Sequence, residues 1–402
     1  MNKIINSCRV CEHNLNNIIL CLENMPLTDE FIGKDKDKRE FLQDIYIFRC
    51  ENCSLVQNPI NFDYSEYYQD YEYSSGHSQF TRAFMSNYAK YVMDESKKIL
   101  GRKVENVIEV GSGDGVQLKY FLDMGVQNVL GVEPSKSLVE QSEKLGVPAL
   151  LDLFSIDIVG KVPDIKFDIC ISSYTLDHVP EPVDFLKTSN KLLSDNGILA
   201  FEVHDLSQIY SRSEWCLFEH EHTIYMDKEI ATDLVERYGF KVLSVNPFNK
   251  NLVRANSLII VAQKIMDLSN KILVSYSNNF PVYKNLDKNI YQTITEIDKW
   301  IYKISKDNRL IGWGVGGRGV MTLAAIKESD KFETIVDSNY DDQELLTPKT
   351  RIKISGVSEL HKYSDCYCLV FSFGYYDEIK EVLLNFGFSD KKIISLDYFY
   401  QN

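Results

Sequence analysis

The sequence predicts an α/β protein in which two α/β domains follow a short cysteine-rich segment. Strand-like apolar segments alternate with helix-like segments from about residue 106, and a second such alternation starts at Arg309. In each alternation the first strand runs into a glycine-rich turn. Two close cysteine pairs lie near the start of the chain. We therefore expect a metal-binding domain at 1–62, a first α/β domain at 63–265 and a second α/β domain at 266–402.

The first alternation predicts a mostly parallel sheet with right-handed crossovers, because helices separate its strands. The expected strands are Asn106–Val110, Asn128–Val132, Phe167–Ile171, Ile198–Val203 and Val253–Val261. The expected helices run from Phe84 to about Leu100, from about Gln117, and over Ser137–Leu145, Phe185–Leu193 and about Tyr225–Phe240. The aromatic stretch Tyr64–Phe80 is expected to form a linker or lid.

The second alternation has the same character. Its expected strands begin at Arg309 and cover Glu333–Asn339 and Cys366–Gly374, with a helix from about Val320 after the first of them. Residues 265–308 are helical in pattern and polar, so we expect them to bridge the two α/β domains.

Charge and apolar patterning exclude several classes of protein. In 402 residues, Lys plus Arg number 44 and Asp plus Glu number 58, which gives a net charge of −14. So acidic a surface argues against nonspecific binding to nucleic acid or to anionic membranes. No apolar stretch has the length of a membrane span, and the N-terminal residues show no secretory apolar region. We expect a cytoplasmic enzyme, in which paired cysteines need an explanation other than disulfides.

The two cysteine pairs predict a structural zinc site. Cys8 and Cys11 form one C-x₂-C knuckle, and Cys50 and Cys53 form another. Four thiolates suit tetrahedral Zn²⁺ and leave no coordination position for a substrate. A redox C-x-x-C motif and two unrelated buried pairs are the alternatives.

The first glycine-rich turn predicts a site for a methyl donor. Glu109 precedes Gly111, Gly113 and Gly115 directly after a strand, and Glu133 closes the next strand. Glycines let a ligand approach the backbone, and a carboxylate at the end of the second strand can accept the hydroxyls of an adenosine ribose. This loop resembles that of class I S-adenosylmethionine methyltransferases. A dinucleotide loop is the alternative, although its usual G-x-G-x-x-G spacing is missing here.

If the donor is S-adenosylmethionine, further residues acquire expected roles. Glu109 would hold the amino-acid end of the donor. Asp152 and Leu153 would lie near the adenine, and Ser172 near the sulfonium.

A dense titratable cluster predicts acid–base chemistry. It contains His220, Glu221 and His222, with His204 nearby in the sequence and His178 just past the third strand. A neutral imidazole can remove a proton that a neighbouring carbonyl has acidified. Surface or capping histidines and a metal-binding H-x-H pair are the alternatives. Tyr71 and Tyr73, in the aromatic stretch, can supply hydroxyl groups.

The second glycine-rich turn reads Gly312–Gly319 and satisfies G-x-G-x-x-G, with Asp337 closing the next strand. Taken alone it predicts dinucleotide binding. The alternative is a turn of Rossmann type that serves only packing.

Taken together, the order of these motifs resembles the nucleotide-sugar C-methyltransferases that act on 4-keto deoxysugars of antibiotic and surface-polysaccharide pathways in bacteria. The segments that carry the resemblance are the two knuckles, YEYSSGHS (Tyr71–Ser78), EVGSGDG, His220-Glu221-His222 with Tyr225, and GWGVGGRG followed by VDSN. The resemblance covers essentially the whole chain.

The resemblance implies roles for particular residues. His222 and Glu221 correspond to the family's catalytic pair, His178 to its active-site histidine, and Tyr73 or Tyr71 to a substrate-site tyrosine. Glu219 stands where the family usually has a tyrosine before H-E-H. The second α/β domain helps to form the substrate cleft, so the sugar pyrophosphate is assigned to the residues Gly314, Gly317, Arg318 and Asp337.

The expected function is C-methylation at C3 of a 4-keto deoxysugar linked to dTDP, GDP or CDP, with S-adenosylmethionine as cofactor and a structural Zn²⁺. The expected assembly is a monomer or homodimer. The alternatives are a sugar O-methyltransferase and an NAD-linked oxidoreductase that uses the C-terminal glycine-rich turn.

Overall fold

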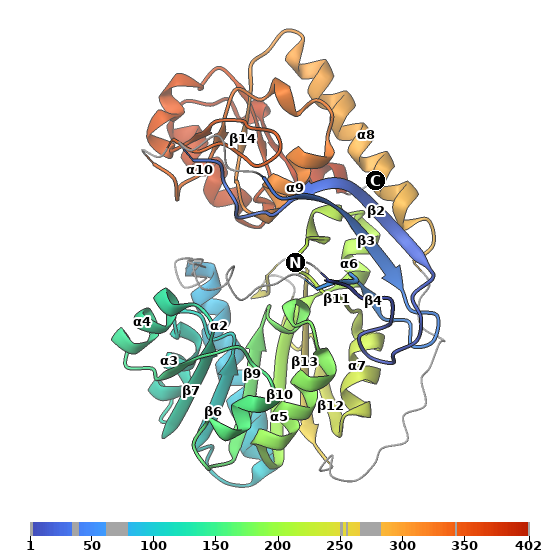
Figure 1. Ribbon diagram of the computed structural model, residues 1–402. Helices are drawn as coiled ribbons and strands as arrows, with labels where there is room; N and C mark the ends of the chain where they lie inside the picture. The colour runs from blue at the N-terminus through green and yellow to red at the C-terminus, as the bar shows by residue number, and fades with distance from the viewer. Residues whose placement is uncertain are drawn as a thin grey trace. The chain divides into compact units, whose positions relative to one another are not determined.

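The computed structural model describes residues 3–33, 40–61, 79–249, 252–254, 256–265, 283–341 and 344–400. The described residues fall into two compact units that interleave along the chain (Figure 1). The first unit takes residues from 1–17, 49–206 and 221–281, and the second from 18–48, 207–220 and 282–402.

A seven-stranded sheet forms the centre of the first unit, with strand order β12-β13-β10-β9-β6-β7-β8. Its strands are β6 (Asn106–Val110), β7 (Asn128–Glu133), β8 (Ala149–Leu151), β9 (Phe167–Ser173), β10 (Leu193–His204), β12 (Phe240–Val245) and β13 (Ser257–Lys264). All pair in parallel except β13, which is antiparallel to both of its neighbours. The strand order reverses between β6 and β9, and ligands of such sheets bind at the carboxyl ends of the strands beside this reversal.

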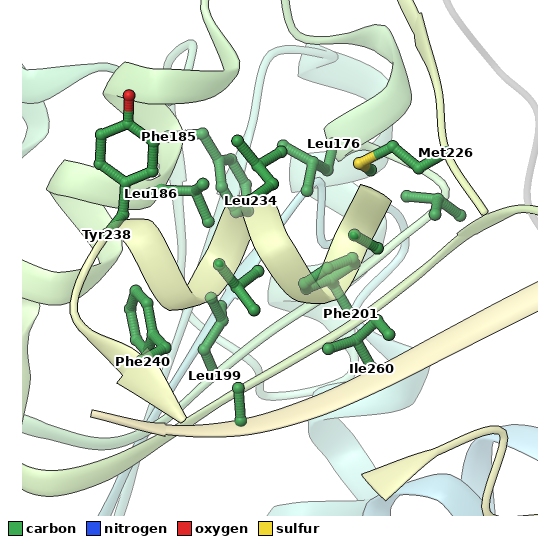
Figure 2. Close-up of a cluster of buried hydrophobic side chains, with 14 of the residues drawn as sticks. Leu176, Phe185, Leu186, Leu199, Phe201, Met226, Leu234, Tyr238, Phe240 and Ile260 are labelled. Atoms are coloured by element: carbon green, nitrogen blue, oxygen red, sulfur yellow. The ribbon is translucent and has the colours of Figure 1, made fainter. Parts of the chain in front are cut away.

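Helices cover both faces of this sheet. Side chains of α2 (Gln79–Leu100) and α3 (Val116–Asp123) pack with one set of alternating strand residues, and those of α5 (Pro182–Leu192) and α7 (Lys228–Arg237) pack with the other set. Figure 2 shows the second cluster, which brings Leu234 of α7 and Phe185 of α5 together with Phe201 and Ile260 of the sheet. Burial on both faces explains why the strands read as nearly continuous apolar runs.

Local signals in the sequence set the ends of several helices. The Asp227 side chain accepts from the Ile230 N–H at 2.8 Å and begins α7, while Gly239 follows the helix with φ of 84°. Ser135 caps α4 (Lys136–Lys144) by accepting from the Leu138 N–H at 3.4 Å. Both caps satisfy N–H groups that have no partner inside the helix.

Four short strands join the chain's N-terminal residues to the first unit. Strand β1 (Lys3–Ile4) pairs with β5 (Ile60–Asn61), and β4 (Val56–Gln57) pairs with β11 (Ile224–Tyr225), both antiparallel. The second pair places residues that follow Cys53 beside residues that follow His222.

The second unit contains a five-stranded parallel sheet of order β16-β15-β14-β17-β18. Its strands are β14 (Leu310–Trp313), β15 (Ile335–Val336), β16 (Ile354–Ser355), β17 (Tyr367–Val370) and β18 (Ile393–Ser395). The helices are α6 (Leu206–Arg212), α8 (Leu286–Ser305), α9 (Gly317–Ala325) and α10 (Tyr376–Asn385). A hairpin of β2 (Ile18–Pro26) and β3 (Leu42–Arg49) also belongs mainly to this unit, and β2 packs against α8 and α9.

The predicted α/β class is confirmed, and several predicted boundaries are corrected. The strand expected at Val253–Val261 begins at Ser257, since Asn256 directly before it lies in a turn. The helix expected from Tyr225 to Phe240 is shorter, since Tyr225 ends β11 and Phe240 begins β12. Of the helical bridge expected at 265–308, the structure describes α8, and residues 266–282 lie outside the described residues. Among the described residues, no helix combines the length and apolar character that crossing a membrane requires.

Candidate active site and metal centre

The four knuckle cysteines converge as the sequence predicts. Their sulfur atoms all lie within 4.8 Å of one another, and two pairs, Cys8 with Cys53 and Cys11 with Cys50, are 3.5 Å apart. Tetrahedral zinc with Zn–S of about 2.3 Å needs sulfur atoms somewhat under 4 Å apart, so the group fits the metal. The thiolates come from both ends of a long segment, and the metal therefore joins residues that are distant in sequence.

Polar groups support the cysteine cluster from outside. The Gln57 side-chain amide donates to the sulfur of Cys8 at 3.2 Å and accepts from the Arg9 N–H at 2.9 Å. The buried Arg9 guanidinium donates to the carbonyl oxygens of Asn58 and, at 2.8 Å, Pro180. Hydrogen bonds of this kind, made to the residues that bind a metal, hold those residues in position. They also tie the first knuckle to the start of α5.

The first glycine-rich loop has the backbone that the motif predicts. Gly111, Gly113 and Gly115 have φ of 69°, 54° and 79°, in the left-handed region that other residues rarely adopt. A Cβ on Gly111 would lie 2.1 Å from Oγ1 of Thr175, whereas a Cβ on Gly113 would meet nothing within 4 Å. The loop therefore leaves open space at its middle glycine, where a ligand can reach the backbone.

Glu109 lies buried at the end of β6, where Gln117 donates to its Oε1 at 2.8 Å. Its Oε2 is buried without a hydrogen-bond partner among the described residues. Burial, with the neighbouring charges of Asp114 and Glu133, raises the pKa of Glu109 well above its ordinary value. A buried carboxyl oxygen of this kind suits a cationic ligand group, such as the ammonium of an amino acid.

Glu133 closes β7 beside the same loop. Its Oε2 accepts from the Gly113 N–H and its Oε1 from the Ser135 N–H, both at 2.9 Å. Burial raises the pKa of Glu133. Each carboxylate oxygen can accept more than one hydrogen bond, so the carboxylate can still receive ribose hydroxyls. These residues fit an adenosine-containing donor for two reasons. The space around Gly113 is open, and the loop lies between the carboxyl groups of Glu109 and Glu133.

The other residues that the sequence predicts to bind the donor lie at the same edge of the sheet. Asp152 is joined by its backbone N–H to the Glu133 carbonyl at 3.1 Å and forms an ion pair with Lys161. Leu153 is 48% exposed, which leaves apolar surface for a flat ring system. Ser172 pairs with Val110 across the sheet, and its hydroxyl is buried without a described partner.

Three imidazoles gather beyond the ends of β9 and β10. The ring centre of His222 lies 4.6 Å from that of His178 and 4.7 Å from that of His204. Tyr225 is another aromatic neighbour of His222, at 6.1 Å between ring centres. The expected neighbours His178 and His222 are therefore together, and both belong to the first unit with the donor loop.

Asp177 and His204 complete this group, and sequence reasoning gave neither of them a role. Oδ2 of Asp177 lies 2.7 Å from Nδ1 of His204 and accepts from the His204 backbone N–H at 3.3 Å. Burial works against the charge of Asp177, but the contacts with His204 and its neighbouring histidines outweigh it, so the pKa of Asp177 is held below its ordinary range. The available signal was position: Asp177 follows β9 and His204 is the last residue of β10, and both strands end at the ligand-binding edge.

His220 contacts residues of the second unit, whereas Glu221 and His222 belong to the first unit. Nε2 of His220 contacts the Met25 carbonyl at 3.0 Å, and its ring meets Phe41 edge to face at 5.0 Å between centres. Burial lowers the pKa of His220 to about 4. Glu221 is buried, 3% exposed. The predicted substrate-site residues Tyr71 and Tyr73 lie outside the described residues.

Two carboxylates contact the second glycine-rich turn, which belongs to the second unit. Asp337 accepts from the Val315 N–H at 3.0 Å. A Cβ on Gly317 would lie 2.3 Å from Oε1 of Glu219, so that carboxylate rests against the first turn of α9. A helix N-terminus attracts negative charge, and here a side chain supplies it. Gly314 has φ of 102° and precedes the helix.

Arg318 extends from the same turn. Its Nε donates to Oε1 of the buried Glu214 at 2.8 Å, and its guanidinium lies 4.7 Å above the ring of Phe373. Arg212 also approaches Glu214, at 3.7 Å. The arginine charge is thus partly neutralised within the unit.

The comparisons with known proteins identify the first unit as a methyltransferase domain of the α/β class. Three family models match the chain in the expected order: "Putative zinc binding domain" over residues 8–68, "Methyltransferase domain" over 81–245 and "C-methyltransferase C-terminal domain" over 262–395. The chain carries a methyltransferase domain between a segment that matches a zinc-binding domain and the C-terminal domain of C-methyltransferases.

Individual relatives are distant. An uncharacterized protein of Haemophilus influenzae is 27% identical over 121 residues, which are 28% of this chain and 47% of the relative. The chain thus spans about half the length of that relative. Among solved structures, a magnesium protoporphyrin IX methyltransferase of Synechocystis is 12% identical, with a TM-score of 0.36 over 51% of this chain and 98% of that one. A methyltransferase of Mesorhizobium loti is 17% identical, with a TM-score of 0.34 over 44% and 99%.

Proposed function

We propose that the protein transfers a methyl group from S-adenosylmethionine to C3 of a nucleotide-linked 4-keto deoxysugar. The observation that carries the proposal is the placement of His222, His178 and the donor loop at one edge of one sheet. A base beside a methyl donor is the arrangement that alkylation of a weak acid needs. The match to a C-methyltransferase C-terminal domain supports carbon as the acceptor atom.

The donor site uses the residues described above. Glu109 holds the amino-acid end of the donor, Glu133 receives its ribose hydroxyls, and Asp152 with Leu153 borders its adenine. When bound, S-adenosylmethionine supplies an electrophilic methyl group on a positively charged sulfur. Ser172 lies at the end of β9, toward the histidines.

In the proposed mechanism the 4-keto group acidifies the C3 proton of the sugar, and His222 removes it. Glu221 orients or polarises His222. His178 donates a hydrogen bond to the developing enolate oxygen. Tyr73 is the other candidate for this hydrogen-bond donor. Burial lowers the pKa of His178, so this imidazole is neutral near pH 7 and can act as a hydrogen-bond donor without adding charge.

The buried setting of this group supports the proposed chemistry. His222 is 4% exposed and Asp177 is 2% exposed. Enolate formation creates charge that water would otherwise solvate, and methylation then cancels charge between the enolate and the sulfonium. Positioning and exclusion of water are therefore expected to supply most of the rate.

We assign the nucleotide part of the substrate to the second unit. Gly314, Gly317, Arg318 and Asp337 are the proposed contacts of the diphosphate, with Glu219 and Tyr71 as further substrate residues. A phosphate group at this turn has to displace the Glu219 carboxylate from the start of α9.

Carbon methylation is separated from O-methylation by proton exchange. Purified protein is mixed with S-adenosylhomocysteine and a panel of dTDP-, GDP- and CDP-linked 4-ketosugars in D₂O, and deuterium at C3 is measured by mass spectrometry. We expect exchange with at least one sugar, and methyl transfer to that sugar when the labelled donor replaces its product. Transfer without any exchange at carbon would support the O-methyltransferase instead.

Two variants test the base. His222→Gln is expected to lose exchange and transfer by about 100-fold or more while the donor still binds, because general-base catalysis contributes at least that much. His361→Gln, a change of an exposed histidine in the second unit, is the matched control and is expected to leave both rates unchanged. Exchange that persists in His222→Gln would contradict the assignment of His222.

A further inference from the structure

The proposed reaction leaves one proton on the enzyme in every turnover. The C3–H bond breaks and a C3–CH₃ bond forms, the sulfonium becomes a neutral thioether, and the proton removed from C3 stays on His222. His222 is almost fully buried, so its proton needs a path to water before the next substrate can react. The inference below rests on the proposed function, because it concerns the fate of that proton.

His204 lies where such a path can begin. Its ring centre is 4.7 Å from that of His222, and ligand-type atoms of the two histidines and Asp177 lie within 4.8 Å of one another. That distance allows transfer through a single bridging water. The His204 side chain is 15% exposed, so it is more open than His222.

The contact with Asp177 allows His204 to carry a proton. The 2.7 Å contact between Asp177 Oδ2 and His204 Nδ1 holds a proton on Nδ1 and leaves Nε2 of His204 for a second partner. A carboxylate on one ring nitrogen stabilises the imidazolium that forms when the other nitrogen is protonated. Oδ1 of Asp177 has no hydrogen-bond partner among the described residues, so the negative charge of the carboxylate remains available to stabilise the His204 imidazolium.

The other neighbour of His222 is less suited to this role. Burial lowers the pKa of His178, and the nearby His204 lowers it further, although Asp177 acts in the opposite sense. His204 contacts a carboxylate directly and is partly exposed, so the relay is assigned to the Asp177–His204 pair.

The remaining groups around His204 form a supporting shell. Tyr174 lies 4.6 Å from His204 between ring centres and has φ of 49°, a left-handed conformation at the end of β9. The Arg254 guanidinium lies 4.6 Å from the ring centre of Tyr174 and pairs with the buried Glu202. The Tyr174 hydroxyl bonds to Ser257 at 3.0 Å. The positive charge of Arg254 is thus neutralised by Glu202.

We propose that His204, held by Asp177, is a relay residue that passes the C3-derived proton from His222 to solvent. In the relay step an N–H bond of the His222 imidazolium breaks as an N–H bond forms at Nε2 of His204, directly or through one water. The proton then leaves Nε2 for bulk water or buffer, and both imidazoles return to their neutral forms. No oxidant, reductant or metal takes part.

The relay is tested by comparing one turnover with many in His204→Gln. The probe is dTDP-4-keto-6-deoxyglucose or whichever nucleotide 4-ketosugar the exchange panel identifies. With enzyme in excess, transfer in the first turnover is expected to stay within about threefold of wild type, because His222 is intact. With substrate in excess, the steady-state rate is expected to fall about tenfold or more, and added imidazole buffer is expected to restore it.

Controls separate this proposal from the proposed function. His222→Gln is expected to lose the first turnover as well, and His361→Gln to change neither measurement. No exchange with any 4-ketosugar in wild type refutes the proposed function. Normal exchange together with equal steady-state rates in wild type and His204→Gln refutes only the relay. A steady-state loss that imidazole does not restore also refutes the relay, since it indicates a purely structural role.

A substrate-free measurement keeps the relay testable in either case. Nitrogen NMR of ¹⁵N-histidine-labelled holoprotein reports which ring nitrogen of His204 carries the proton. We expect Nδ1–H in wild type, with a weaker preference in Asp177→Asn. An Nε2–H form in wild type overturns the proposal, as does a second zinc ion per chain that is lost in His204→Gln.

Discussion

The backbone N–H of Thr223 donates to the carbonyl of Asp177 at 2.7 Å, and the Thr223 hydroxyl donates to the same carbonyl at 3.1 Å. These bonds hold the residue after His222 against the turn that carries Asp177 and His178. The Thr223 carbonyl in turn accepts from the Asn58 N–H at 3.0 Å. The position of the proposed base thus depends on the chain segment that follows the last zinc ligand.

Loss of zinc is therefore expected to abolish methyl transfer as well as to destabilise the protein. Structural zinc sites contribute about 10 kcal/mol or more in small domains, and here the metal also holds the segment that pairs β4 with β11. Cys53→Ser is expected to lower the zinc content, the melting temperature and the transfer rate together. Cys21→Ser, a cysteine outside the cluster, is the control. Full activity in protein shown by metal analysis to lack zinc would refute this coupling.

Gly111→Ala is expected to weaken S-adenosylmethionine binding by about tenfold or more. The added Cβ meets Thr175 Oγ1 at 2.1 Å, so the loop has to move, and the left-handed φ costs about 1–2 kcal/mol in addition. Calorimetry with the donor measures the effect. Gly125→Ala is the matched control, because Gly125 has φ of 85° but open space around a Cβ. The double variant Gly111→Ala/Thr175→Ala is expected to recover part of the affinity. Equal donor affinities in Gly111→Ala and Gly125→Ala would count against the loop assignment.

Glu219→Gln is expected to tighten the binding of dTDP, used as a probe for the substrate diphosphate, by about tenfold. The carboxylate of Glu219 lies against Gly317 at the start of α9 and repels a phosphate that approaches the same helix end. Equilibrium binding of dTDP to wild type and variant measures the change. Glu381→Gln, which removes the same charge from an exposed position on α10, is the control. Unchanged affinity would place the diphosphate elsewhere.

His220 is expected to make the protein less stable as the pH falls from about 6.5 to about 4. Burial lowers the pKa of His220 to about 4, so in this interval the unfolded chain takes up a proton that the folded chain does not. The free energy of unfolding therefore decreases as the pH falls, by about 3 kcal/mol for this group once the pH is below 4. Urea unfolding at several pH values tests the sign. His220→Gln is expected to flatten the slope and His361→Gln to leave it unchanged; equal slopes in all three proteins would show that His220 does not titrate as inferred.

Sequence patterns identified the features that local chemistry determines. Cys8, Cys11, Cys50 and Cys53 are recognisable because the spacing within each knuckle already suits one metal, and Gly111 because a turn after a buried strand needs a left-handed residue. The core strands were recognisable because burial on both faces leaves apolar runs. Their exact ends were less accessible, since β12 and the start of β13 depend on pairing between distant segments.

The tertiary structure decided which polar groups meet. Asp177 follows β9 and His204 ends β10, and only the parallel pairing of these strands brings the two residues to one edge of the sheet. Glu219 and Gly317 are nearly a hundred residues apart in the sequence, so no local pattern reveals that a carboxylate lies against that helix. The sequence by itself determined the cysteine cluster, the left-handed glycine loop and the α/β class, because these depend on spacing along the chain. The structure alone decided the partner of each titratable group, because that depends on which chain segments pack together.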